Sequence, residues 1–157
     1  MKYLVITFVL LFSKASYGFD YGAYEQTTFD DIYERSDVLV NEHREDIGIS
    51  IPNPTVKAAF TGKISKMPYE CSDEALKNFM KMVGFKTNQF PPINYCIELE
   101  SISGRRATFH LQDSLVPYVF EEVDVGEFVY IWVIWAYTDG YKKKPYFLIN
   151  AYEENGT

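Results

Sequence analysis

The feature that most constrains the fold is a run of alternating side chains with a single glycine near its centre. Between Val56 and Ser65, apolar or small residues alternate with polar ones, and Ala59 is the one apolar residue on the polar side. A period of two predicts a long, half-buried β-strand. Gly62 weakens a flat strand, but it permits the sharp coiling by which one strand can serve two sides of a small barrel.

Four further strands are predicted downstream. Tyr95–Leu99 and Ala107–Leu111 both alternate, and the turn Ser101–Gly104 between them predicts an antiparallel hairpin. Phe128–Tyr137 is apolar on both faces, which is typical of a strand covered on both sides. Tyr146–Tyr152 follows as the last strand. The inward positions of these strands predict one shared core: Phe60, Ile64, Ile97, Leu99, Phe109, Leu111, Val129, Ile131, Val133 and Leu148.

The N-terminal part is predicted to be an arm followed by a short helix. Phe19–Gln26 has aromatics without a period and is expected to pack on the domain. Thr28 with an acid three residues later forms a capping-box pattern and predicts a helix from there to about Arg35. Val38–Val40 and Ile47–Ile51 are expected as short apolar pieces on either side of the charged run Asn41–Asp46, which is either a solvated turn or a poorly paired edge.

Two more helices are predicted between the strands. Ser72 as N-cap and Gly84 as stop bracket a helix over residues 73–83. Asp113-Ser114 begins a second, which contains Pro117 and runs to about Glu122.

The predicted elements follow one another along the chain as a long strand with a glycine, a long connection that contains a helix, a β-hairpin, a short helix and a second β-hairpin. This order resembles the OB-fold over roughly Val56–Glu153. The resemblance implies a mainly β protein with short helices, built on a five-stranded Greek-key barrel with an N-terminal helical extension. The expected organisation is a leader over 1–18, an arm and short helix over 19–55, and the barrel over 56–153.

The first eighteen residues have the pattern of a secretory signal peptide. A basic start precedes the apolar run Tyr3–Phe12, and small residues at Ser16 and Gly18 suit cleavage before Phe19. As a helix the apolar run spans only about 15 Å, which is too short for a permanent membrane anchor. The mature protein is therefore expected to be secreted or periplasmic.

The net charge of the chain limits the classes of partner that it can bind. The chain carries 15 Lys and Arg against 22 Asp and Glu, and loss of Lys2 and Lys14 with the leader shifts the net charge from −7 to −9. Such a chain is a poor candidate for binding nucleic acid.

In an exported protein, Cys71 and Cys96 predict a disulfide that contributes roughly 3 kcal/mol to stability. A zinc site needs more ligands than these and the two histidines, His43 and His110, and a catalytic thiol needs an unpaired cysteine beside a histidine.

Two surfaces are candidates for binding. In OB-folds, ligands cross the second and third strands, and that face here carries Glu98, Glu100, Arg106, Thr108 and His110. The loop between the last two strands adds Tyr141 and three lysines: Lys142, Lys143 and Lys144. The alternative is a set of surface ion pairs and a solubilising turn.

Three functions remain open at this point. The first is a small exported binding module for a partner protein or an envelope glycan. The second is an inhibitor or immunity-type protein that neutralises a basic enzyme with acidic loops at Glu42–Asp46 and Glu121–Asp124. The third is a hydrolase, for which the sequence has no Gly-x-Ser-x-Gly, His-Glu-x-x-His or phosphate-loop motif. Neither a cofactor nor a metal is expected.

Overall fold

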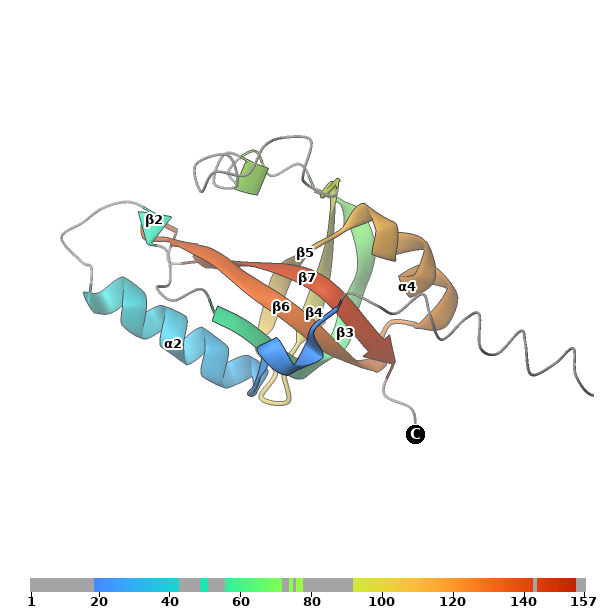
Figure 1. Ribbon diagram of the computed structural model, residues 1–157, viewed down its shortest axis with the longest axis horizontal. Helices are drawn as coiled ribbons and strands as arrows, with labels where there is room; N and C mark the ends of the chain where they lie inside the picture. The colour runs from blue at the N-terminus through green and yellow to red at the C-terminus, as the bar shows by residue number, and fades with distance from the viewer. Residues whose placement is uncertain are drawn as a thin grey trace, which may run out of the picture.

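The computed structural model describes residues 19–42, 49–50, 56–71, 74, 76–77, 92–142 and 144–154 (Figure 1). The predicted leader, Lys143 and most of the predicted helix 73–83 lie outside these residues. The longer elements are α2 (Phe29–Glu42), β3 (Val56–Glu70), β4 (Tyr95–Glu100), β5 (Arg106–Leu111), α4 (Val116–Glu122), β6 (Phe128–Asp139) and β7 (Lys144–Glu154). The shorter ones are η1 (Tyr21–Ala23), β1 (Glu25–Gln26), β2 (Ile49–Ser50) and η3 (Asp113–Leu115).

Five strands close into a barrel in the order β3–β4–β5–β7–β6 and back to β3. The β5–β7 pair is parallel and the other four pairs are antiparallel. The short helix α4 connects β5 to β6. The sequence-based prediction of an OB-fold-like barrel is therefore confirmed, with β1 and β2 added at the edges.

The long strand β3 pairs with two different strands of the barrel, as its central glycine predicted. Residues 56–63 of β3 pair with β6, and residues 63–70 pair with β4, with register shifts beyond Ile64. A Cβ on Gly62 would lie only 3.3 Å from the Cβ and Cδ1 of Leu99. Glycine is therefore used where β3 crosses from one neighbour to the other and approaches the core closely.

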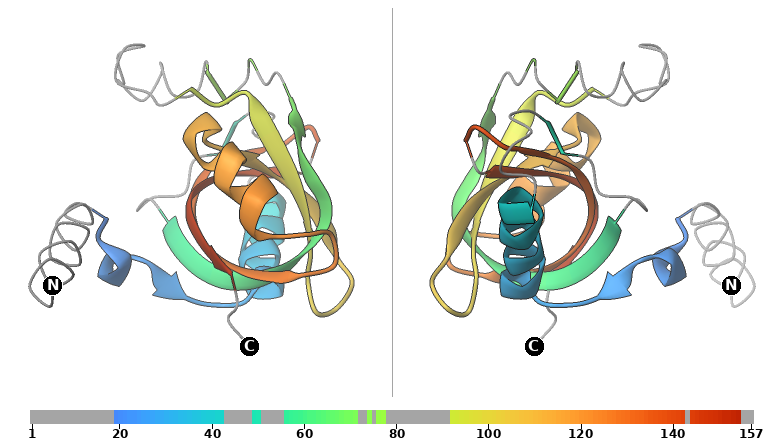
Figure 2. Two further views of the ribbon diagram at one scale, coloured as in Figure 1. Left: turned by 90° about the vertical axis from the view of Figure 1, so that its right-hand side faces the viewer. Right: turned by 90° about the vertical axis from the view of Figure 1, so that its left-hand side faces the viewer.

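A helix covers each end of the barrel (Figure 2). At one end, Phe29, Ile32 and Tyr33 of α2 belong to the barrel core. At the other end, α4 inserts Val116 and Val119 into the same core. The interior is therefore closed by the chain's own side chains at both ends.

Helix α2 begins where the sequence predicted but is twice as long. The Oγ1 of Thr28 accepts the backbone N–H of Asp31, as an N-cap does. The prediction of an end near Arg35, with Val38–Val40 as a separate piece, is wrong, since the helix continues to Glu42. Contacts beyond this segment favour the helix: the buried Oγ of Ser36 lies 3.3 Å from the Oγ1 of Thr138 on β6. Tertiary packing here outweighs the weak helix propensity of valine.

The core contains every predicted member except one. Phe60, Phe109 and the rest pack together, with ring centroids of Phe109 and Phe147 5.5 Å apart. Leu148 is the exception, because β7 turns Phe147 and Ile149 into the barrel instead. The run from Tyr146 to Ile149 is apolar at every position, so the sequence could not show which parity faces inward.

The N-terminal arm packs on the outside of the barrel, as expected. Phe19 stacks on Tyr24 at 5.2 Å, and Tyr21 meets Trp132 of β6 edge-on at 4.8 Å. Strand β1 then pairs in parallel with β3. The arm therefore covers the outer side of the β3–β6 pair.

Candidate functional site

The outward side of the central strands carries a row of alternating charges. We call it the β3–β5 face and define it by Lys63, Lys66, Glu98, Glu100 and Arg106. Ile97 and Leu99 point into the core, so Glu98 and Glu100 point outward between them. Lys63 and Arg106 lie opposite Glu100 on the two neighbouring strands. The sheet register therefore brings Glu98, Glu100 and Arg106 to one surface, and it adds Lys63 and Lys66 of β3, which the sequence reasoning did not place there.

Glu100 is held by a cation on each side. Its Oε1 lies 2.7 Å from the Nζ of Lys63, and its Oε2 accepts the Nε–H of Arg106 at 2.7 Å. These hydrogen bonds, that to Lys63 foremost, hold the pKa of the Glu100 carboxyl below its usual range. Glu100 is therefore a carboxylate near neutral pH and is fully occupied within the chain.

Glu98 forms the second group on this face, and Tyr69 belongs to it. The Nζ of Lys66 lies 3.7 Å from the Oε1 of Glu98, which also accepts the hydroxyl of Tyr69 at 3.2 Å. Lys66 lies 3.8 Å from the centroid of the Tyr69 ring, as in a cation–π pair. Sequence reasoning missed Tyr69, because the predicted strand ended before Pro68 and β3 in fact runs on to Glu70.

The cations of this face are more exposed than the carboxylates. Side-chain exposure is 69% for Arg106, 53% for Lys66 and 36% for Lys63, against 32% for Glu98 and 15% for Glu100. A molecule that approaches the face meets the cationic groups first. An acidic chain therefore presents a locally basic surface here.

The loop Asp139–Lys144 is the second predicted patch. The Oδ1 of Asp139 accepts the backbone N–H groups of Tyr141 and Lys142 at 2.9 and 3.0 Å, which fixes a tight turn. This turn leaves Tyr141 74% exposed. The Nζ of Lys144 lies 5.3 Å from the ring centroid of Tyr146.

His110 is buried rather than presented on the β3–β5 face. It is 5% exposed, and its ring stacks on Tyr146 at 5.9 Å with an interplanar angle of 14°. The expectation that His110 contributes to an exposed charged face does not match this position. Tyr146, which the sequence reasoning left out of the site, lies between His110 and Lys144 and so connects the β4–β5 hairpin to the loop.

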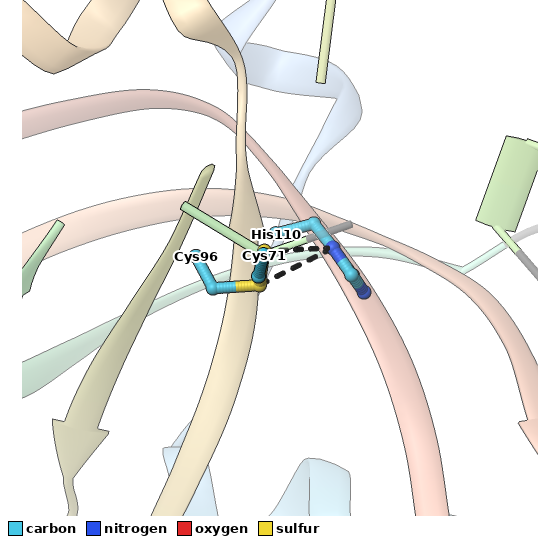
Figure 3. A group of neighbouring side chains, drawn as sticks. All are labelled: Cys71, Cys96 and His110. Atoms are coloured by element: carbon cyan, nitrogen blue, oxygen red, sulfur yellow. Dashed lines mark hydrogen bonds between the residues drawn. A yellow bond between two sulfur atoms is a disulfide. The ribbon is translucent and has the colours of Figure 1, made fainter. Parts of the chain in front are cut away.

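The predicted disulfide joins Cys71, just beyond β3, to Cys96 of β4 (Figure 3). The Nδ1 of His110 lies 3.5 Å from the Sγ of Cys96 and 3.9 Å from the Sγ of Cys71. Among the described residues, these three side chains form the one group of His, Cys, Asp or Glu compact enough to hold a metal ion, with ligand atoms within 4.8 Å of one another. The carboxylates of the β3–β5 face form no such group within the described part of the chain.

The cavity at the α4 end of the barrel offers a ligand no polar anchor apart from one tyrosine. It lies against α4, and its lining is aliphatic except for Tyr152: Ile64, Ile97, Leu99, Leu111, Val119, Val123, Val129, Ile131, Ile149 and Tyr152. The hydroxyl of Tyr152 donates to Glu122 at 2.5 Å. This cavity is therefore poorly suited to a polar ligand.

Comparison of the chain with protein-family models gives no match, and comparison with curated proteins gives none. In the described residues, no helix combines the length and the apolar character needed to cross a bilayer. Function is therefore inferred from the site itself.

Proposed function

We propose that this protein is an exported binding module that recognises an acidic partner protein through the β3–β5 face and the loop Asp139–Lys144. The observation that carries the proposal is the difference in exposure on that face, where Arg106 and Lys66 stand above the enclosed carboxylates of Glu98 and Glu100. Opposite charge across an interface steers association and selects partners. A chain with a net charge of −7 that nevertheless exposes Lys66 and Arg106 on one face is suited to an acidic partner.

The aromatic side chains beside the cations also favour a macromolecular partner. Tyr69 lies against Lys66, and Tyr141 is exposed on the loop Asp139–Lys144. Tyrosine and arginine are enriched at protein interfaces because they combine contact area with hydrogen-bonding groups. An acidic envelope glycan is the competing ligand, since sugars also stack on aromatic rings.

Export is part of the proposal. Its supports are the leader pattern over residues 1–18 and the Cys71–Cys96 disulfide, a bond that persists in oxidising compartments. Secretion and a periplasmic location are both compatible with it.

Inhibition of a basic enzyme is the second candidate, and one observation favours it. Around α4, Tyr118 and Phe120 are each 55% exposed beside the exposed acids Glu121, Glu122 and Asp124. An apolar patch bordered by acids suits a basic protein surface. The predicted loop Glu42–Asp46 lies almost wholly outside the described residues.

Affinity capture with matched charge variants tests the leading proposal. The mature protein, Lys66→Gln with Arg106→Gln, and Lys142→Glu with Lys144→Glu are each immobilised and exposed to envelope or secreted extract. Both double variants should lose the partner retained by the wild type, and salt should weaken wild-type capture because exposed charges are screened. Lys57→Glu is the control, since Lys57 is an exposed lysine on the part of β3 that pairs with β6. Capture that survives both double variants but is lost when Glu121 and Glu122 are neutralised would transfer the function to the second candidate.

A further inference from the structure

We infer that Cys71, Cys96 and His110 form a metal site that the disulfide closes and that reduction opens, with Zn²⁺ or a similar thiolate-preferring ion as its ligand. The proposal is independent of the β3–β5 face. It rests on the geometry by which three adjacent strands bring two sulfurs and one imidazole nitrogen together (Figure 3).

The sheet register places the three residues side by side. His110 on β5 lies directly opposite Cys96 on β4, and Tyr69 on β3 lies opposite Cys96 from the other side. Cys71 follows β3 by one residue, and its backbone N–H donates to the carbonyl of Asn94 at 2.8 Å. All three side chains are therefore positioned by paired backbone rather than by a free loop.

One nitrogen–sulfur distance matches that of a tetrahedral site, and the other exceeds it by about 0.4 Å. With metal–sulfur bonds of about 2.3 Å and a metal–nitrogen bond of about 2.0 Å, tetrahedral angles separate nitrogen from sulfur by about 3.5 Å. The observed separations from Nδ1 of His110 are 3.5 and 3.9 Å. Once the disulfide is reduced, the two sulfurs need to separate to about 3.8 Å for the metal to fit between them.

The ring of His110 is fixed in the orientation the site needs. It is buried and stacks on Tyr146, which in turn stacks on Tyr137 at 4.5 Å. Neighbours that hold an imidazole in place raise metal affinity, because less freedom is lost on binding. The tautomer required carries its proton on Nε2 and leaves the lone pair of Nδ1 for the metal.

Two molecules of a thiol reductant, R–SH, supply the electrons and protons that reduction of the Cys71–Cys96 disulfide requires. Cys71 is partly exposed and Cys96 is buried, so the thiolate of the first R–SH attacks the Cys71 sulfur and the Cys96 sulfur leaves as a thiol. A second R–SH resolves the mixed disulfide and leaves as R–S–S–R, so the protein gains two electrons and two protons. The metal ion then displaces one proton from each thiol. Three protein ligands leave the fourth position for water or an external ligand, whereas structural zinc sites are closed by four protein ligands.

Cobalt titration of the mature protein tests the inference. The protein is reduced with a phosphine under nitrogen, so that no added thiol competes for metal, and Co²⁺ is added while the thiolate charge-transfer and tetrahedral ligand-field absorption are recorded. The reduced wild type should bind one Co²⁺ per chain, Zn²⁺ should displace it, and the oxidised protein should bind none. His110→Gln should weaken binding by at least about tenfold, and Cys71→Ser with Cys96→Ser should abolish it.

Circular dichroism recorded in parallel covers the case in which reduction unfolds the chain. If the reduced protein stays folded, Zn²⁺ should raise its melting temperature and leave that of the double serine variant unchanged. If reduction unfolds it, Zn²⁺ should restore the β-sheet spectrum. Failure of the reduced wild type to bind Co²⁺ stoichiometrically, or equal affinity in His110→Gln, would overturn the site.

Discussion

Truncation of Phe109 to alanine should cost the barrel about 4–5 kcal/mol of unfolding free energy. The ring is fully buried, and its centroid lies 5.4 Å from that of Phe29, 6.0 Å from Phe60 and 5.5 Å from Phe147. Removing about 100 Å² of buried apolar surface accounts for about 2.5 kcal/mol at 25 cal/mol per Å². Loss of the aromatic pairs and the cavity left behind bring the total to the upper part of the range for Phe→Ala, about 3–5 kcal/mol.

The upper part of that range follows from how the neighbours are anchored. Phe29 belongs to α2, while Phe60 and Phe147 belong to β3 and β7, so no single element can move in to fill the space. Urea unfolding followed by tryptophan fluorescence measures the change, and the melting temperature should fall by roughly 10–20 °C. Phe128→Ala, at a position 45% exposed on β6, is the control and should cost less than about 1 kcal/mol. A loss below about 1.5 kcal/mol for Phe109→Ala would show that α2 does not close this end of the barrel.

Three further predictions follow from individual contacts. Gly62→Val should lower the unfolding free energy by about 1–3 kcal/mol in the same urea assay, because the new side chain must displace Leu99. An unchanged urea midpoint would contradict the close approach of β3 to Leu99. Intact mass should show two fewer hydrogens before reduction than after it, and reduction should cost roughly 3 kcal/mol, whereas alkylation of the native, unreduced protein would disprove the disulfide. Since Lys63 and Arg106 lower the pKa of Glu100, its stabilising contribution is present above the ordinary carboxyl range and is lost as pH falls through the lowered pKa. A carboxyl-carbon NMR titration should place the Glu100 midpoint below that range in the wild type and nearer to it in Lys63→Ala; equal midpoints would refute the pairing.

The barrel could be predicted from the sequence because its strands repeat a simple pattern. The alternation around Gly62 predicts one strand, and the turns further along predict how the later strands are connected. Together these local signals leave few possible orders of the strands in the sheet. The prediction was wrong where the local signal was uniform or weak. The apolar run around Leu148 has no period to orient it, and the end of α2 is decided by packing against Thr138, about a hundred residues away.

The candidate site was predicted only for the charges of the β4–β5 hairpin, and Lys63 and Lys66 of β3 were missed. Opposed charges on a hairpin, such as Glu100 and Arg106, follow directly from strand register. The roles of Tyr69 and Tyr146 depend on where β3 ends and on how the face continues from β5 to β7, and neither is visible in local sequence. The proximity of His110 to both cysteines likewise requires the three-dimensional pairing of β3, β4 and β5.

Site-specific photo-crosslinking tests the proposed binding face most directly. One variant carries a photoreactive residue at Thr108, which lies opposite Glu98 on the β3–β5 face, and the other carries it at Phe120 on α4. After irradiation in envelope or secreted extract, we expect a discrete adduct with an acidic protein from position 108, weakened by added salt, and none from position 120. An adduct from position 120 alone, or equal adducts from both, would contradict recognition through the β3–β5 face.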